Sequence, residues 1–396
     1  MRALILSLFL IVNSNSIFSQ NANQNILDEI KVKAKETHSD AVIIIKDGKT
    51  IYEDYFEKEN KPIYIASAGK SLVNLAIGKL IDTKQLNSLD QPVYTLFPEW
   101  KQGKKKDVTI RMLLNHTSGI QNYQNAGIEL EPAPNYKVKN IIDLALSAEL
   151  SSVPGEKFDY NNKAVALLGG IVEKASGKRF DYFFVDEFYK PMGIANYNWV
   201  QDDDGNPTTH GAFYIKASDL VKFGELLLNK GIYNNQRIIS ESWIEESFKA
   251  GQKFDPRFGL LWWRKPAFEK RIIDDEIWKT WKDANIDKAF LKKMKPLKNK
   301  LYENKNDLFS DLKIIFGDDW SNTLNDNLGK DLKSSKRIYS NEIVAYYADG
   351  YRGNYLVIIP QKNIVAVRCA DHEGFNYQTD FFRDFVELIM QLSESQ

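Results

Sequence analysis

Residues 62–82 read PIYIASAGKSLVNLAIGKLID, in which a short apolar strand runs directly into Ser67 and a long helical pattern follows. Apolar residues recur at helical spacing from Leu72 to Ile81, which predicts a helix over this part of the stretch. Residues three apart are neighbours on a helix surface, so Lys70 is expected on the same face as Ser67. The stretch therefore predicts a hydroxyl and an amine in contact where a strand meets a helix.

Such a pair can form a nucleophile and its base. Serine alone is a weak nucleophile, and a lysine can take its proton only if the lysine pKa falls from about 10.4 toward neutrality. Burial and neighbouring cations would lower the pKa of Lys70, and a change of about three pKa units corresponds to roughly 4 kcal/mol. The N-terminus of the helix would also favour negative charge that develops on a substrate.

The Ser-x-x-Lys spacing occurs a second time, at Ser310 and Lys313. Ser67 follows a strand, has the small neighbours Ala68 and Gly69, and opens an apolar helix. Ser310 lies in a polar segment beside a phenylalanine and a leucine, which is typical of the surface of a helix. Only Ser67 is predicted to be catalytic.

Both ends of the chain carry strand patterns. A helical pattern at 26–34 precedes a hairpin whose tight turn is Asp47-Gly48, and a last helix is expected at 376–392. Chain ends usually meet at the surface of a domain. We therefore expect one antiparallel sheet built from the strands at 41–45, 50–56, 342–348, 355–359 and 364–368.

The middle of the chain, about 67–230, has mostly helical periodicity, with helices expected at 141–150, 163–175, 180–189 and 217–228. A chain of 396 residues exceeds the roughly 300 residues beyond which one core usually splits. We therefore expect an α/β lobe from about 25–66 and 340–394, with the helical lobe inserted between its two parts.

The segment at about 265–339 differs in composition from the rest. It is rich in Lys, Asp and Asn, and its aromatic residues, Trp278, Trp281, Phe290, Phe309 and Trp320, have spacings that suggest helices. One interpretation is a lid or a partner-binding insertion. The other is a set of helices that pack on the body and solvate their charged faces.

The first residues indicate export. Arg2 precedes an apolar run from Ala3 to Val12, and the small Ser19 precedes a plausible cleavage point, so 1–19 are predicted to be a secretory signal peptide. The run is about half of the roughly 20 apolar residues that a membrane-spanning helix needs. The expected product, 20–396, is a periplasmic or secreted protein without a transmembrane segment.

Composition excludes several classes of function. Lys and Arg number 53 against 53 Asp and Glu, so the chain offers no net field for a nucleic-acid backbone. Its four histidines are scattered, which argues against a metal site, and we expect no cofactor. Its single cysteine, Cys369, cannot form an internal disulfide. Nothing in the sequence indicates an oligomeric state.

A second catalytic group is expected to relay the proton, and a tyrosine that a nearby lysine holds partly ionised can do so. The tripeptide Tyr-x-Asn occurs five times, at Tyr123, Tyr160, Tyr233, Tyr302 and Tyr339. Only Tyr160 follows a rigid Pro154-Gly155 turn and directly precedes a helical pattern with small residues. Tyr160 is therefore the candidate, with the amide of Asn162 available to orient a substrate.

Several segments together resemble the serine β-lactamase and penicillin-binding-protein-like hydrolases, especially class C β-lactamases, D-alanyl-D-alanine carboxypeptidases and related esterases. Besides Ser67-Ala-Gly-Lys70, they are Leu113-Leu-Asn-His-Thr-Ser-Gly-Ile120, the segment 154–162 with Tyr160, and 350–360. The resemblance covers most of 20–396 except the 265–339 insertion. It implies an α+β, β-lactamase/transpeptidase-like fold, with an antiparallel sheet flanked by helices from both chain ends plus an inserted helical lobe.

The resemblance also implies roles for single residues. Ser67 would be the acylated nucleophile, Lys70 its proton partner, and Tyr160 the general acid or base that serves the leaving group. The backbone N–H groups of Ser67 and Tyr351, which follows Gly350, would form the oxyanion hole, where each donor is typically worth roughly 3 kcal/mol. The substrate would be a small-molecule or peptide ester or amide.

The third motif departs from the family. Where the family usually has Lys-Thr-Gly, this chain has Ala348-Asp349-Gly350, so the glycine is kept and the cation is absent. Asp349 would repel a substrate carboxylate, unless Arg352 points into the site and supplies a substitute charge. Esters or amides without that carboxylate are therefore expected rather than efficient penicillin hydrolysis.

Other classes of function fit the sequence less well than a Ser-Lys-Tyr hydrolase does. A Ser-His-Asp hydrolase would normally show Gly-x-Ser-x-Gly, which the chain lacks. His116 is interpreted as a structural histidine, and Trp262 and Trp263 as core residues. A non-catalytic module that binds or senses cell-wall peptide stays open as an alternative, although such a module would not need Ser67, Lys70 and Tyr160 together.

Overall fold

The structure is a computed structural model that describes residues 23–122, 138–211, 213–329 and 332–392. The chain divides into two compact units, one of residues 1–264 and 344–396 and the other of residues 265–343. The predicted signal peptide at 1–19 lies outside the described residues. Within the described ranges, no helix combines the length and the apolar character that crossing a membrane requires.

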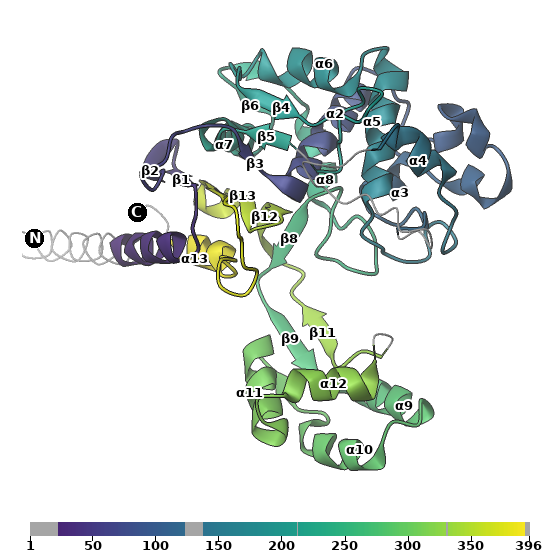
Figure 1. Cartoon of the computed structure of the whole chain (residues 1–396), viewed down its shortest axis with the longest axis vertical. Coiled ribbons are helices and arrows are strands. Elements are labelled where there is room, and N and C mark those ends of the chain that lie inside the picture. The colour runs from purple at the N-terminus through teal and green to yellow at the C-terminus, as the bar shows by residue number, and fades with distance from the viewer. Residues whose placement is uncertain (1–22, 123–137, 212, 330–331, 393–396) are drawn as a thin grey trace, which may run out of the picture. The chain divides into compact units, whose positions relative to one another are not determined.

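The larger unit is organised around one antiparallel sheet with the strand order β2-β1-β14-β13-β12-β8 (Figure 1). It joins strands from both ends of the chain, as predicted: Ala41 pairs with Cys369 where β1 meets β14. Its hairpin turns at Asp47 and Gly48, whose φ angles of 52° and 70° suit a tight turn. The bounds are β1 Ala41–Lys46, β2 Lys49–Asp54, β8 Trp263–Pro266, β12 Ile343–Gly350, β13 Asn354–Ile359 and β14 Ile364–Cys369.

One face of this sheet is covered by the two terminal helices, which lie side by side (Figure 1). Ile30 of the helix at residues 23–36 and Ile389 of α13 (Phe385–Gln391) belong to one buried cluster with Val357 of β13. The prediction that the last helix begins at Asn376 was wrong. Residues 376–384 form turns instead, because the Asp380 side chain accepts the backbone N–H of Asn376 and ties the chain back locally.

The other face is covered by α7 (Ala217–Leu228). A Cβ on Gly224 would lie 2.2 Å from the Val365 side chain of β14, so the helix backbone approaches the sheet closely. The predicted bounds of this helix are confirmed. Its assignment to the inserted helical lobe was wrong, because α7 packs on the sheet.

A second, three-stranded sheet has the order β3-β5-β4. The short strand predicted just before Ser67 belongs to this second sheet, since β3 (Ile63–Tyr64) pairs with β5 (Phe213–Ile215). Neither β5 nor β4 (Tyr197–Trp199) was predicted, because two or three residues are too few to show the alternation of a strand. Pairing with β5 holds the strand that leads into Ser67.

The helices between the two strand-rich ends enclose a large apolar core. Most of α2 and α5 is buried, which matches their many small and apolar residues. The remaining elements of this unit are short. The bounds are α2 Lys70–Asp82, η2 Val93–Thr95, η3 Pro98–Trp100, η4 Gly103–Asp107, α3 Ile110–Leu114, α4 Ile141–Ser147, α5 Asn162–Ser176, α6 Phe180–Phe184, η5 Val185–Tyr189, β6 Ile232–Tyr233, β7 Gln236–Arg237 and α8 Glu241–Phe248.

The smaller unit, 265–343, contains the segment of distinct composition and has a hydrophobic core of its own. Trp281 and Phe290 are buried in that core, and Ser310 is exposed on α11, as expected for a residue on a helix surface. The predicted helices are present, together with a three-stranded sheet of order β10-β9-β11. The bounds are β9 Glu269–Ile272, α9 Asp275–Asp283, α10 Lys288–Met294, η6 Lys295–Leu297, β10 Leu301–Tyr302, α11 Lys305–Phe316, α12 Trp320–Leu328 and β11 Lys336–Tyr339.

Candidate active site

Ser67 lies on a single 3₁₀ turn, η1 (Ala66–Gly69), which continues directly into α2. Ala66 has a φ of 49°, a strained value for a residue with a side chain, and the hydroxyl of Ser67 is left half-exposed among buried neighbours. Small residues permit this crowding. A Cβ on Gly69 would contact the Phe213 side chain at 3.4–3.6 Å, and a Cβ on Gly350 would lie 2.2 Å from the backbone oxygen of Ile65.

Lys70 points back to the serine, and its Nζ lies 2.8 Å from the Ser67 Oγ. The same Nζ donates to the backbone oxygen of His210, and the residue is only 2% exposed. Burial lowers the pKa of Lys70 to about 7. The expectation that burial lowers the pKa of Lys70 agrees with this environment, whereas the expectation that neighbouring cations share in lowering it was wrong.

Tyr160 also contacts the serine, through its side-chain hydroxyl. Burial of the phenol raises the pKa of Tyr160 above its usual value, and a hydrogen bond with Ser67 opposes that rise only in part. The Nζ of Lys70 is 5.2 Å from the centre of the Tyr160 ring. The expectation of a partly ionised phenol was wrong, because desolvation keeps the hydroxyl protonated and able to donate.

The Tyr160 loop is held by the segment around His116. The Nδ1 of His116 accepts the backbone N–H of Asn161 at 3.2 Å, and its ring centre is 4.6 Å from that of Tyr160. Asn161 in turn caps α5, accepting the N–H of Ala164 and donating to the backbone oxygen of Ile120. Burial, together with the charge of Lys70, lowers the pKa of His116 to about 3. His116 is thus a neutral, buried ring that positions the tyrosine, consistent with the structural interpretation.

His210 belongs to the site although the sequence did not indicate it. Its backbone oxygen accepts from Lys70, and burial with the charge of Lys70 lowers the pKa of its imidazole to about 3. No motif marks this residue, since it lies 140 positions from Lys70 and acts through its backbone. The tie between Ser71 Oγ and the backbone oxygen of Leu261, at 2.6 Å, was likewise invisible in the sequence.

The two N–H groups expected to form the oxyanion hole come from neighbouring segments. Gly350, at the end of β12, lies against Ala68, since a Cβ on it would be 3.0 Å from the Ala68 nitrogen. Within the described residues, the backbone N–H groups of Ser67 and Tyr351 donate no hydrogen bond. Both donors therefore remain available to an oxygen of a bound substrate. Asn162, the first residue of α5, is half-buried beside Tyr160.

Asp349 occupies the third motif without a compensating cation. Its side chain is half-buried, and burial raises the pKa of its carboxyl to about 7. Arg352, the possible substitute cation, forms an ion pair with Asp371 instead. Ala348, at the position of the family's lysine, is buried in the core.

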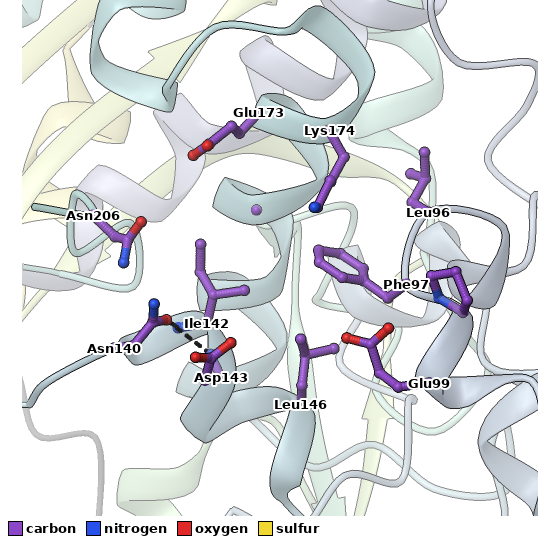
Figure 2. Close-up of a pocket in the computed structure, with 12 residues that line it drawn as sticks. Leu96, Phe97, Glu99, Asn140, Ile142, Asp143, Leu146, Glu173, Lys174 and Asn206 are labelled. Atoms are coloured by element: carbon purple, nitrogen blue, oxygen red, sulfur yellow. Dashed lines mark hydrogen bonds between the residues drawn. The ribbon is translucent and has the colours of Figure 1, made fainter. Parts of the chain in front are cut away.

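A separate hollow of about 230 Å³ lies in the helical part of this unit (Figure 2). Figure 2 shows Glu173 and Lys174 of α5 on one side, with Asp143 of α4 hydrogen-bonded through its backbone N–H to the Asn140 side chain. None of the residues that line this hollow belongs to the Ser67 site. Among the residues that the structure describes, no group of His, Cys, Asp and Glu has the arrangement of a metal site.

Comparisons with known proteins identify the family and the fold. Protein flp of Staphylococcus aureus (strain MW2) is 29% identical over 177 residues, which are 41% of this chain and 34% of flp. The match thus spans only about a third of that relative's length. A solved putative beta-lactamase from Bacteroides dorei DSM 17855 superposes with a TM-score of 0.64 at 18% identity, covering 93% of this chain and 98% of the other.

A solved putative 6-aminohexanoate-dimer hydrolase from Bacillus anthracis superposes with a TM-score of 0.62 at 17% identity, covering 92% of this chain and 81% of that one. Identities this low establish a shared fold and nothing finer. The family model described as Beta-lactamase, however, matches residues 27–381. The chain therefore belongs to the β-lactamase family of serine hydrolases.

Proposed function

We propose that the chain hydrolyses ester or amide substrates through an acyl-enzyme on Ser67. The observation that carries this proposal is the 2.8 Å contact between the Ser67 Oγ and the Nζ of Lys70, an amine whose burial lowers its pKa to about 7. A neutral amine at this distance can accept the proton of the hydroxyl as it attacks. An ordinary exposed lysine, with a pKa near 10.4, would be protonated at neutral pH and could not do so.

In the first half of the reaction, the Ser67 oxygen attacks the substrate carbonyl carbon while its proton passes to Lys70. The carbonyl oxygen becomes an oxyanion, which the N–H groups of Ser67 and Tyr351 stabilise. As the tetrahedral intermediate collapses, the bond to the leaving group breaks, and Tyr160 gives that group a proton. A proton then passes from the Lys70 ammonium to the Tyr160 phenolate, which restores both neutral groups.

In the second half, water attacks the acyl carbon and its proton passes to the same basic groups. The bond to the Ser67 oxygen breaks, the serine regains a proton, and the acid is released. We assign to Asn162 the orientation of the substrate and to Gly350 the open space beside the serine. No carboxylate-binding lysine is present in the third motif, so esters and amides are favoured over penicillins as substrates.

The test compares the wild type with Ser67→Ala, using p-nitrophenyl acetate for turnover and a fluorescent penicillin for labelling. Ser310→Ala is the matched control, because it removes the serine of the second Ser-x-x-Lys, which is exposed on α11. We expect activity or labelling in the wild type and in Ser310→Ala and none in Ser67→Ala. If the wild type shows neither reaction above the Ser67→Ala level, the hydrolase proposal fails and a peptide-binding module takes its place.

We also propose that residues 1–19 direct export and are removed. Expression of the full chain in a bacterium with a periplasm, followed by mass spectrometry of the N-terminus, tests this. A product that begins near residue 20 supports export, and a product that retains residues 1–19 in the cytoplasm contradicts it.

A further inference from the structure

Asp349 carries a half-buried carboxyl group that has no partner among the residues that the structure describes. It takes part in no hydrogen bond or ion pair with any described residue, and desolvation is the sole cause of its altered acidity. Buried and half-buried carboxylates are normally paired, because leaving one without a donor is costly. This carboxylate therefore has the character of a binding group that awaits a ligand.

Three arginines in the same part of the fold as Asp349 have other partners. Arg352 pairs with Asp371, and Arg257 pairs with Asp255. Arg368 is fully buried and donates to backbone oxygens, including that of Gly353. None of these three side chains pairs with Asp349, and within the described ranges no other cation does, so the carboxyl group is open to a cation of a ligand.

Two tyrosines are neighbours of Asp349 in the large sheet. Tyr347 precedes Asp349 by two residues on β12, so the two side chains share a face of the strand, and Tyr355 lies directly opposite Asp349 on β13. Burial is the main cause that raises the pKa of the Tyr347, Tyr355 and Tyr160 phenols, and the negative charge of Asp349 adds to the rise in each. Asp349 thus lies in a setting rich in tyrosine.

Tyr160 and Tyr347 are connected by a series of ring contacts, whereas the Tyr355 ring stacks on Phe385 in the core. The Tyr160 ring is 6.3 Å from Phe258, Phe258 is 4.9 Å from Trp263, and Trp263 stacks on Tyr347 at 6.5 Å. A carboxylate beside several aromatic faces is the chemistry that recognises an alkylammonium group, since both attract a positive charge and the rings accept its methyl or methylene surface.

We propose that Asp349 binds an ammonium group carried by the leaving group of the substrate, so that the enzyme prefers esters or amides of cationic alcohols or amines. This inference rests on the proposed function. We place the ammonium group on the leaving-group side because Asp349 directly precedes Gly350, whose backbone lies against Ala68 beside Ser67. The charge of Asp349 also adds to the rise that burial causes in the pKa of Tyr160, the proton donor of the leaving group.

The experiment compares acetylthiocholine with S-(3,3-dimethylbutyl) thioacetate, two thioesters with the same acyl group and leaving groups of the same shape. Only the first leaving group is charged. Release of the thiol is followed with a disulfide reagent such as 5,5′-dithiobis(2-nitrobenzoate), and the protein's single cysteine, Cys369, is buried and does not interfere. Each variant is described by the ratio of the two kcat/KM values.

We expect the wild type to prefer the cationic thioester by about tenfold or more, a typical worth for a desolvated cation in such a setting. Asp349→Asn should bring the ratio close to one. Asp186→Asn is the matched control: it removes the same charge from a surface carboxylate that pairs with Lys178 and Lys190, and it should keep the wild-type ratio.

The outcomes separate the two proposals. If the wild type hydrolyses neither thioester faster than Ser67→Ala does, the proposed function fails. If it hydrolyses both with a ratio near one, or if Asp349→Asn keeps the wild-type preference, the hydrolase stands and the ammonium site is refuted. Should Asp349→Asn not fold, the wild type itself decides: choline must inhibit hydrolysis of the neutral thioester competitively at concentrations where 3,3-dimethylbutanol does not.

Discussion

Replacing Lys70 with methionine should abolish acylation and at the same time stabilise the protein. The lysine is 2% exposed, and its Nζ is held by the Ser67 hydroxyl and the backbone oxygen of His210, with no carboxylate among these partners. Burial lowers the pKa of Lys70 from 10.5 to about 7. Methionine has a similar length and no charge, so Lys70→Met removes the cost of burying an amine.

The magnitude follows from proton linkage. Between about pH 7 and 10.5 the unfolded chain binds a proton at Lys70 that the folded chain does not, so the free energy of unfolding of the wild type rises with pH in this window. At about 1.4 kcal/mol for each tenfold change in proton affinity, the penalty is about 5 kcal/mol at pH 6 and about 2 kcal/mol at pH 9. Loss of the two hydrogen bonds of Nζ offsets about 1 kcal/mol each and does not depend on pH.

The assay is urea unfolding of the wild type and Lys70→Met at pH 6, 7.5 and 9, read on the transition of the unit that contains residue 70. We expect the stability gained by the variant to shrink by about 3 kcal/mol from pH 6 to pH 9. Lys79→Met is the control, because Lys79 is on the same helix but pairs with Glu187. A gain that stays constant across this pH range would refute the lowered pKa, and with it the assignment of Lys70 as a base.

Four further outcomes follow from the same site. The kcat/KM for a neutral ester should rise with pH through about 7 as Lys70 loses its proton, and a flat profile from pH 5 to 9 would contradict this. Tyr160→Phe should slow hydrolysis of an alkyl ester by about 10²–10⁴-fold and of p-nitrophenyl acetate far less, because nitrophenolate leaves without a proton; equal losses on both would argue against a proton donor. Asp349→Lys should raise labelling by a fluorescent penicillin relative to turnover of a neutral ester, and an unchanged ratio would remove the carboxylate argument. Gly350→Ala should strongly reduce acylation, since its Cβ would lie 2.2 Å from the Ile65 backbone oxygen, and near-normal labelling would show that β12 need not approach Ser67 so closely.

The large sheet could be predicted because its central strands are long and apolar throughout. β1, β13 and β14 are buried along their whole length, and such runs stand out in a sequence. Short elements could not be predicted in this way. β3 has two residues, and its partner β5 is about 150 positions away, so their pairing depends on tertiary contacts that no local pattern reports.

The position of α7 shows a second limit. Its apolar periodicity gave the correct bounds, but the same periodicity would suit any surface that could cover its apolar face. What assigns α7 to the sheet is the contact of Gly224 with Val365, more than a hundred positions later. Amphipathic pattern thus predicts that a helix packs, and the partner is decided by the rest of the fold.

The candidate site likewise combines a contact that local sequence predicts with properties that depend on distant segments. The contact between Ser67 and Lys70 follows from helix geometry over three residues, and it is present. The acid–base properties of the site depend instead on burial, which comes from segments far apart in the chain, such as those at His116 and His210.

One physical cause acts on both titrating groups of the site in opposite directions. Desolvation disfavours charge, so it lowers the pKa of Lys70 and raises the pKa of Tyr160. Two groups whose pKa values are pushed apart in this way are suited to be the base and the acid that serve one hydroxyl. Their roles therefore depend on the same exclusion of water, and a change that admits water beside Ser67 should weaken both together.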